Sequence, residues 1–158
     1  MRPCTVARCS ALIGLLALAA WARPRAPMPE LAGVVPEGLE SFLAAHPLAP
    51  GQPVRVDQVG RTPAASFHVA QIGTAEAPHR HRDHDLAVFV LQGQGVLTLD
   101  GQHIMLRPGD AALIARGRAH WFARQGPRNA VSFAIFTPPL DAPDTVPETG
   151  VDSRQGGR

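Results

Sequence analysis

The stretch GTAEAPHRHRDHDLAVFVLQG, residues 73–93, decides how this chain of 158 residues is interpreted. His79 and His81 stand two positions apart, just before the apolar run 86–92. Residues two apart on a strand share a face and lie about 7 Å apart along the chain. Neutral imidazoles are common ligands of transition metals, so the pair can converge on one ion. The apolar run predicts a strand that is buried on both faces.

A second stretch, GDAALIARGRAHWFAR at residues 109–124, places His120 after a turn that contains Gly117. The strand that it predicts has Phe122 on the same face as His120, where Phe122 would form an apolar wall. Between the two stretches stands Asp100-Gly101, flanked on both sides by strand-like segments. An Asp-Gly pair in this position predicts a tight β-hairpin.

Working outward from these stretches, a hydrophobic period of two recurs along most of the chain. The predicted strands span residues 54–59, 65–73, 86–92, 95–100, 102–107, 111–115, 119–124 and 130–137. A helical period precedes them at 36–46, where Pro36 suits the first turn. The content of 15 Gly and 16 Pro fits many turns between short strands. The pattern favours a closed barrel or a jelly roll of antiparallel strands.

The first stretch resembles the first motif of the cupin superfamily. That motif is a Gly, five residues, His-x-His, three or four residues, an acidic residue, and a Gly about six residues further on. Gly73, His79, His81 and Gly93 match it in order, and Asp85 stands in the region of the acidic residue.

The second stretch resembles the second cupin motif: a Gly, five residues, Pro-x-Gly, two residues, His, three residues and Asn. Gly109, Gly117 and His120 match it at these spacings. Ala115 replaces the Pro and Arg124 replaces the Asn. Two motifs at the right separation are a more specific signal than either one alone.

The resemblance covers about residues 54–137 and implies an all-β fold, a cupin-type double-sheet β-barrel or jelly roll, with one short N-terminal helix. It also implies that His79, His81 and His120 hold one divalent transition metal ion. Iron, manganese, zinc, nickel and copper all remain open, because imidazole serves each of them.

A fourth ligand is less well defined. Typical cupins use the acidic residue of the first motif, and counting from His81 that residue is Asp85. Counting back from Gly93, the position falls on Leu86, and one step along a strand turns a side chain to the opposite face. We therefore include Asp85 among the candidate ligands, with His84 as a weaker alternative.

The first 22 residues have the order of a secretory signal peptide. Arg2 and Arg8 precede the apolar run 11–20, which is followed by the small-x-small pattern Ala20-Trp21-Ala22. An apolar run of this length is too short to span a bilayer. We expect cleavage near Ala22, export to the periplasm or the medium, and no stable membrane anchor afterwards.

Cleavage at this point changes the composition. It removes two of the 15 basic residues and leaves 13 basic against 13 acidic residues. No nucleic-acid partner is expected, because such a partner requires a net basic face. Both cysteines, Cys4 and Cys9, lie in the removed segment, so thiol chemistry and Cys-ligated zinc are excluded for the remainder.

The expected organisation is a signal peptide at 1–22, a lead-in with the short helix at 23–53, the barrel at 54–137 and a flexible tail at 138–158. The family resemblance implies a small-molecule ligand and is compatible with a homodimer. Fold alone does not choose a reaction. We favour a metal-dependent enzyme of the dioxygenase or isomerase type; the alternative is a non-catalytic module that binds a small ligand or the metal itself. The sequence singles out no catalytic residue.

Overall fold

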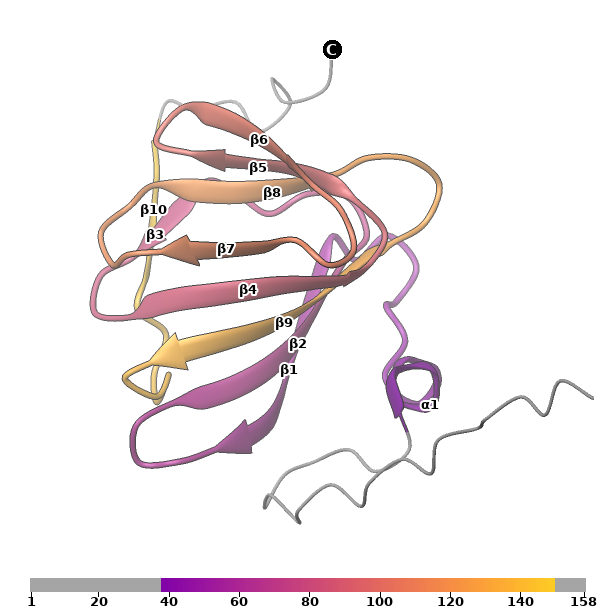
Figure 1. Cartoon of the computed structure of the whole chain (residues 1–158), viewed down its shortest axis with the longest axis horizontal. Coiled ribbons are helices and arrows are strands. Elements are labelled where there is room, and N and C mark those ends of the chain that lie inside the picture. The colour runs from indigo at the N-terminus through magenta and orange to yellow at the C-terminus, as the bar shows by residue number, and fades with distance from the viewer. Residues whose placement is uncertain (1–37, 150–158) are drawn as a thin grey trace, which may run out of the picture.

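The computed structural model describes residues 38–149 and shows two antiparallel sheets that face one another, with one short helix on the outside (Figure 1). The predicted all-β, double-sheet fold is confirmed. The elements are α1 (Gly38–Ala45), β1 (Val54–Arg61), β2 (Ser66–Ile72), β3 (His79–His81), β4 (Asp85–Gln92), β5 (Gly95–Leu99), β6 (Gln102–Leu106), β7 (Ala111–Ile114), β8 (His120–Arg124), β9 (Ala130–Thr137) and β10 (Thr145–Pro147).

Each sheet has five strands. The first has the order β1-β2-β9-β4-β7 and the second has the order β10-β3-β8-β5-β6. Their inner faces meet in a core of buried side chains: Leu86, Val90, Leu97, Leu106, Ile114, Ala134 and Phe136. Because side chains alternate along a strand, every second residue of β4, β9 and β8 is directed into this space. The candidate ligands His79, His81 and His120 belong to the second sheet, at the end of the barrel where β3 and β8 meet.

The hairpin between β5 and β6 forms as predicted. Asp100 and Gly101 both have a positive φ, 46° and 79°, and Leu99 pairs with Gln102 across the turn. Two consecutive positive φ values match the twist of the flanking strands, and Gly adopts them without a steric penalty. The hairpin carries β5 alongside β8, so it fixes one neighbour of the strand that begins at His120.

The helix α1 packs on the outer face of the first sheet, where Phe42 contacts Val69 and Val131. It ends at Ala45, shortly before Pro47, which cannot continue a helix. The predicted helix at 36–46 therefore agrees with the structure over its described part. The described residues form no helix long and apolar enough to cross a membrane.

The prediction that the run 86–92 is buried on both faces is wrong. Val88 and Val90 of β4 face the interior, but Phe89 is 44% exposed and Leu91 is 42% exposed. In the described part of the chain, α1 is the element that packs on this outer face, and its contacts lie over β2 and β9 instead. The apolar run reflects an outer face that α1 leaves uncovered.

The segment after β9 also differs from the expected flexible tail. Residues 145–147 form β10, which pairs with β3 through Val146 opposite Arg80. A strand of three residues that ends in Pro147 gives almost no periodic signal, and Pro is tolerated because β10 is an edge strand. The predicted signal peptide at 1–22 and the last residues, 150–158, lie outside the described residues.

Candidate metal centre

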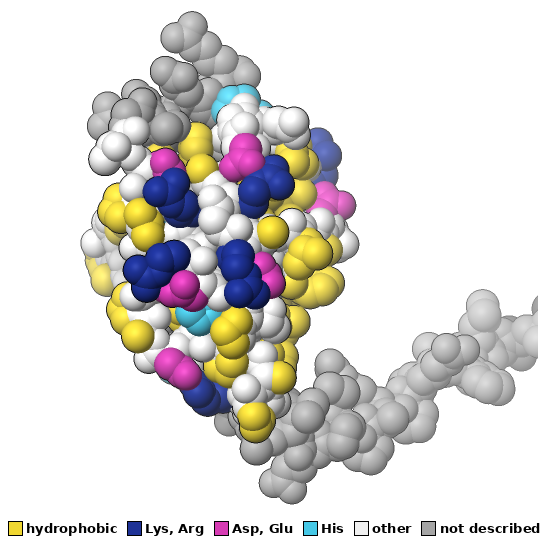
Figure 2. Space-filling view, turned by 90° about the vertical axis from the view of Figure 1, so that its left-hand side faces the viewer, with side chains coloured by type: hydrophobic (Ala, Val, Ile, Leu, Met, Phe, Trp, Pro, Cys, Tyr) yellow, Lys and Arg dark blue, Asp and Glu magenta, His cyan; other side chains and the backbone are white. Residues whose placement is uncertain are grey.

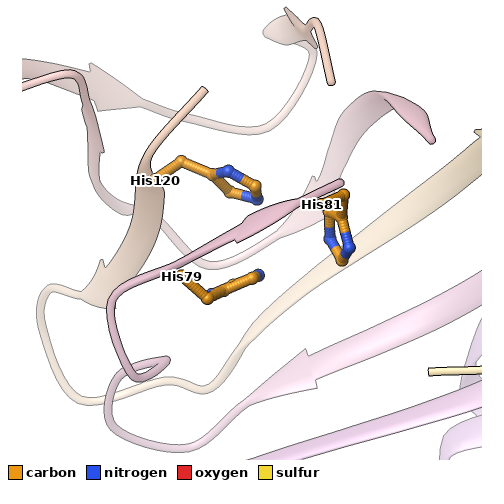
Figure 3. Close-up of side chains that lie close together, drawn as sticks. All are labelled: His79, His81 and His120. Carbon is orange, nitrogen blue, oxygen red and sulfur yellow. The ribbon is translucent and has the colours of Figure 1, made fainter. Parts of the chain in front are cut away.

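Three histidines from two neighbouring strands meet at one point (Figure 3). His79 and His81 share a face of β3, and His79 pairs with His120 of β8. The ring centroids are 5.1 Å apart for His79 and His81, 4.4 Å for His79 and His120, and 5.3 Å for His81 and His120. One nitrogen from each ring lies within 4.8 Å of the other two. The structure thus brings these three predicted ligands together.

Backbone carbonyls orient two of the rings. Nδ1–H of His79 donates to the carbonyl oxygen of Ala77 at 2.7 Å, and Nδ1–H of His120 donates to that of Arg118 at 2.9 Å. A carbonyl oxygen only accepts, so Nδ1 carries the hydrogen in both rings. The lone pair of each neutral imidazole therefore lies on Nε2, as ligation through Nε2 requires.

A carboxylate orients the third ring. Nδ1–H of His81 donates to Oδ1 of Asp144 at 2.9 Å, and Oδ2 of Asp144 accepts from Nδ1–H of His84 at 2.5 Å. Nε2–H of His84 donates in turn to the carbonyl oxygen of Pro139 at 3.1 Å. Both nitrogens of His84 thus face oxygens that only accept. Because its two ring nitrogens are hydrogen-bonded to Asp144 and Pro139, His84 does not contribute a nitrogen to the cluster of three histidines.

The loop before His120 is fastened to the strand of the other two histidines. The backbone N–H of Gly117 donates to the carbonyl oxygen of His81 at 2.7 Å. Gly117 has a φ of 80°, a conformation that glycine adopts at little cost. This contact gives a physical role to the Gly of the second motif, because it sets the position from which β8 begins.

A divalent transition metal fits the donor set. The structure leaves Nε2 of His120 buried without a hydrogen-bond partner among the described residues. A buried polar atom without a partner is costly, and a metal ion at the meeting point of the three rings would remove that cost. Carbonyl and carboxylate oxygens hold the Nδ1–H of metal-ligating histidines in this way in general.

The electrostatics favour neutral imidazoles. Burial lowers the pKa of His120 to about 4. Burial also lowers the pKa of His81, although the hydrogen bond to Asp144 opposes the shift. Rings that stay neutral at physiological pH offer a lone pair to a metal without first losing a proton.

Asp85 is not brought to the three histidines. It is the first residue of β4, and its carboxylate is hydrogen-bonded by Arg116 through the backbone N–H at 2.9 Å and through Nη2–H at 2.8 Å. These bonds lower the pKa of Asp85 to about 2. The next residue, Leu86, is the one that points into the core. The inward-facing position of β4 therefore agrees with the count back from Gly93. Asp85 lies outside the candidate site, which corrects the prediction that it is a metal ligand.

A cavity of about 430 Å³ lies beside the histidines, between the two sheets. His79, His81 and His120 form part of its wall, and Phe122 lines it as predicted. Val56 of the edge strand β1 also lines the cavity and is 51% exposed, so the cavity reaches solvent along that strand. Ligand sites are typically concave, largely apolar spaces of this size.

Glu76 is a second functional candidate that the sequence did not single out. It lines the cavity, and its Oε2 accepts a hydrogen bond from the backbone N–H of Phe122 at 2.8 Å. Burial raises the pKa of Glu76, against the effects of His79 and of the Phe122 N–H. Glu76 lies in the variable spacer of the first motif, and Asp144 lies in the tail, so neither had a positional signal.

Charged side chains gather at the end of the barrel where β4 begins and β7 ends. Basic and acidic side chains lie next to one another there (Figure 2). They include the ion pairs of Arg116 with Asp85 and of Arg118 with Asp100. These charges neutralise each other outside the cavity, so Arg116 and Arg118 do not extend to the histidines.

Comparison with known proteins identifies related chains. Residues 66–136 match the family model described as "Cupin domain". An uncharacterized protein of Aquifex aeolicus (strain VF5) is 39% identical over 93 residues, which make up 59% of this chain and 76% of that protein.

Solved structures share the architecture. KdgF from Halomonas sp. matches with a TM-score of 0.54 at 26% identity, over 60% of this chain and 84% of that chain. TT1209 from Thermus thermophilus matches with a TM-score of 0.53 at 20% identity, over 60% and 94%. PAC13 of Streptomyces, solved with uridine, matches with a TM-score of 0.55 at 14% identity, over 65% and 84%. The last two likenesses support the fold alone.

Proposed function

This chain belongs to the cupin superfamily, and on that premise we propose that it binds one divalent transition metal through His79, His81 and His120 and acts as a metal-dependent enzyme on a small molecule. One observation carries the proposal. All three rings are oriented through Nδ1–H, and the buried Nε2 of His120 has no partner in the described part of the chain.

A bound divalent metal would supply Lewis-acid chemistry or the activation of oxygen, as in isomerase-like or dioxygenase-like reactions. The chain's own residues would prepare the site for it. Asp144 and two carbonyl groups hold the rings, and the apolar wall of the cavity keeps water away from a bound molecule. Exclusion of water strengthens every electrostatic interaction inside the site.

The donor count favours an enzyme over a purely structural metal site. Three imidazoles approach from the second sheet, whereas Asp85, the expected fourth ligand, is bound to Arg116. Catalytic metal sites generally have three protein ligands and an open position, whereas structural zinc sites use four protein ligands. The three histidines line the cavity, so a metal that they held would be within reach of a molecule bound there.

Metal analysis and turnover test the proposal together. Protein purified from its native compartment should contain about one equivalent of a divalent transition metal by elemental analysis. The metal-loaded protein is then assayed with a panel of small molecules for oxygen consumption and for isomerised products. Turnover that disappears on chelation and returns with metal supports the enzyme. Saturable binding of panel members without turnover would favour the non-catalytic module instead.

We further propose that the protein acts outside the cytoplasm. The support is the order of Arg2 and Arg8, the apolar run 11–20 and the pattern Ala20-Trp21-Ala22. Mass spectrometry of exported protein should find a chain that begins near Arg23. Recovery of a soluble cytoplasmic form that retains Met1 would contradict export.

A further inference from the structure

The wall of the cavity is unusually poor in polar groups. Among the described residues that line it there is no Arg, Lys, Asn, Gln or Tyr. Apart from the three histidines, the polar side chains on the wall are Glu76, Ser132 and Thr145, and Glu76 is the only acid among these lining residues. A sugar or a nucleoside buried here would leave most of its polar groups without partners, at a cost for each one.

Glu76 is held in place by the backbone. Its N–H donates to the carbonyl oxygen of Phe122 at 2.9 Å, and its Oε2 accepts from the N–H of Phe122 at 2.8 Å. The side chain of Glu76 therefore accepts the hydrogen bond of a backbone N–H group of β8. Within the described residues, no donor reaches Oε1, so this oxygen is left to accept a hydrogen bond from a molecule in the cavity.

Resting on the proposed function, we propose that the cavity selects a largely apolar small molecule with one neutral hydrogen-bond donor, such as a phenolic or enolic hydroxyl, and that Glu76 recognises this donor. The apolar wall supplies the binding energy and Glu76 supplies the specificity. Donation to a carboxylate is stronger than a neutral hydrogen bond, so the loss of the hydroxyl should weaken binding substantially.

The same carboxylate acts against anions. A ligand that carries its own carboxylate would place two like charges in an apolar space without a basic side chain on the wall. Small organic acids are therefore disfavoured in the metal-free protein. We therefore expect the site to bind neutral hydrogen-bond donors more tightly than anions, and this difference in affinity, rather than tight binding of one molecule, characterises it.

Three naphthalene probes that share one ring system and differ in a single substituent test the proposal in the metal-free protein at mildly alkaline pH: 2-naphthol, 2-methoxynaphthalene and 2-naphthoate. Fluorescence titration should show that 2-naphthol binds at least tenfold more tightly than either of the others, and that uridine does not compete. Because no metal is present, this result is independent of the metal assignment. Metal content is measured on a separate sample, so the two proposals can fail separately.

Glu76→Gln separates recognition from structure. The amide oxygen of Gln can still accept from the N–H of Phe122, so the fold is expected to persist, as checked by circular dichroism. The affinities of the variant for 2-naphthol and 2-methoxynaphthalene should lie within about threefold of each other. Its affinity for 2-naphthoate should be at least tenfold higher than that of the wild type. Glu40→Gln, on the exposed helix α1, should retain the wild-type preference.

Neighbouring residues of β7 locate the bound probe. Ala112 lines the cavity, whereas Leu113 is 76% exposed on the outer face. Ala112→Leu should weaken the binding of 2-naphthol at least tenfold, and Leu113→Ala should leave this binding unchanged. The reverse result would place the probe on the outer face and overturn the proposal. Equal binding of all three probes by the wild type, or a preference for 2-naphthoate or uridine, would also overturn it, even if Glu76→Gln fails to fold.

Discussion

Asp144 accepts a hydrogen bond from Nδ1–H of His81 at 2.9 Å, although the two residues are 63 positions apart in the chain. Burial alone would raise the pKa of Asp144, but hydrogen bonds from His84 and His81 hold it below its usual range. The carboxylate therefore stays ionised between two histidines. The segment that carries β10 completes the support of the candidate site.

Asp144→Asn should weaken metal binding about 10- to 100-fold, the usual effect of removing such a support. The amide offers one accepting oxygen where the carboxylate offers two, so one of the two Nδ1–H groups loses its acceptor. Metal titration by calorimetry measures the effect. Asp141→Asn, at an exposed ion pair with Arg61, is the control and should retain wild-type affinity. Wild-type affinity in Asp144→Asn would show that the carboxylate does not support the site.

Asp85→Asn should leave the metal affinity within about threefold of the wild type, because Asp85 binds Arg116 rather than facing the histidines. Only a small change in melting temperature is expected, since exposed ion pairs contribute little to stability. The same calorimetric titration decides. A tenfold loss of affinity, about 1.4 kcal/mol, would mean that Asp85 reaches the metal.

The stability of the metal-free protein should fall as the pH decreases below about 6.5, in part through His68. Burial lowers the pKa of His68 from its ordinary 6.5, so the folded protein binds fewer protons than the unfolded chain in this range. Stability then rises with pH until the unfolded chain has also lost its proton. His81 and His120 shift in the same direction and contribute to the same loss.

His68→Gln removes one of these titrations and should make the decline shallower, by at most about 1.4 kcal/mol per pH unit. Urea denaturation at several pH values between about 4 and 8 gives the slope. A decline of equal steepness in both proteins would rule out a contribution from His68.

Phe136 supports several histidines at once from β9. Its ring lies edge-on to His81 at 5.0 Å and to His68 at 5.1 Å between ring centroids. Phe136→Ala should therefore destabilise the protein by about 3–5 kcal/mol through the cavity that it creates. Phe89→Ala, a substitution of the same type at an exposed position, should cost much less. Urea denaturation compares the two, and similar costs would contradict the assigned burial.

Local patterns predicted much of the fold. Alternation of apolar residues located the main strands, and Asp100-Gly101 located a hairpin, because both signals come from adjacent residues. The pair of His79 and His81 was visible for the same reason. The addition of His120 depended on motif spacing, since β8 joins β3 only in the folded chain.

Other features depended on long-range contacts. Glu76 acquires a role because β8 brings Phe122 alongside it in the folded chain, and Asp144 acquires one because β10 pairs with β3. Neither residue stands in a periodic segment. Asp85 illustrates the opposite problem: two spacing counts differed by one residue, and only the phase of β4 showed that Leu86 takes the inward position.

The central claim is that His79, His81 and His120 bind one divalent transition metal, and the most direct measurement is metal stoichiometry combined with thermal stability. Free metal at a thousand times its dissociation constant should stabilise the wild type by about 4 kcal/mol. His120→Ala should lose the bound equivalent and most of the metal-dependent rise in melting temperature. His103→Ala, at an exposed residue that pairs with Thr98, should retain both. Equal metal content and an equal rise in His120→Ala and the wild type would contradict the account.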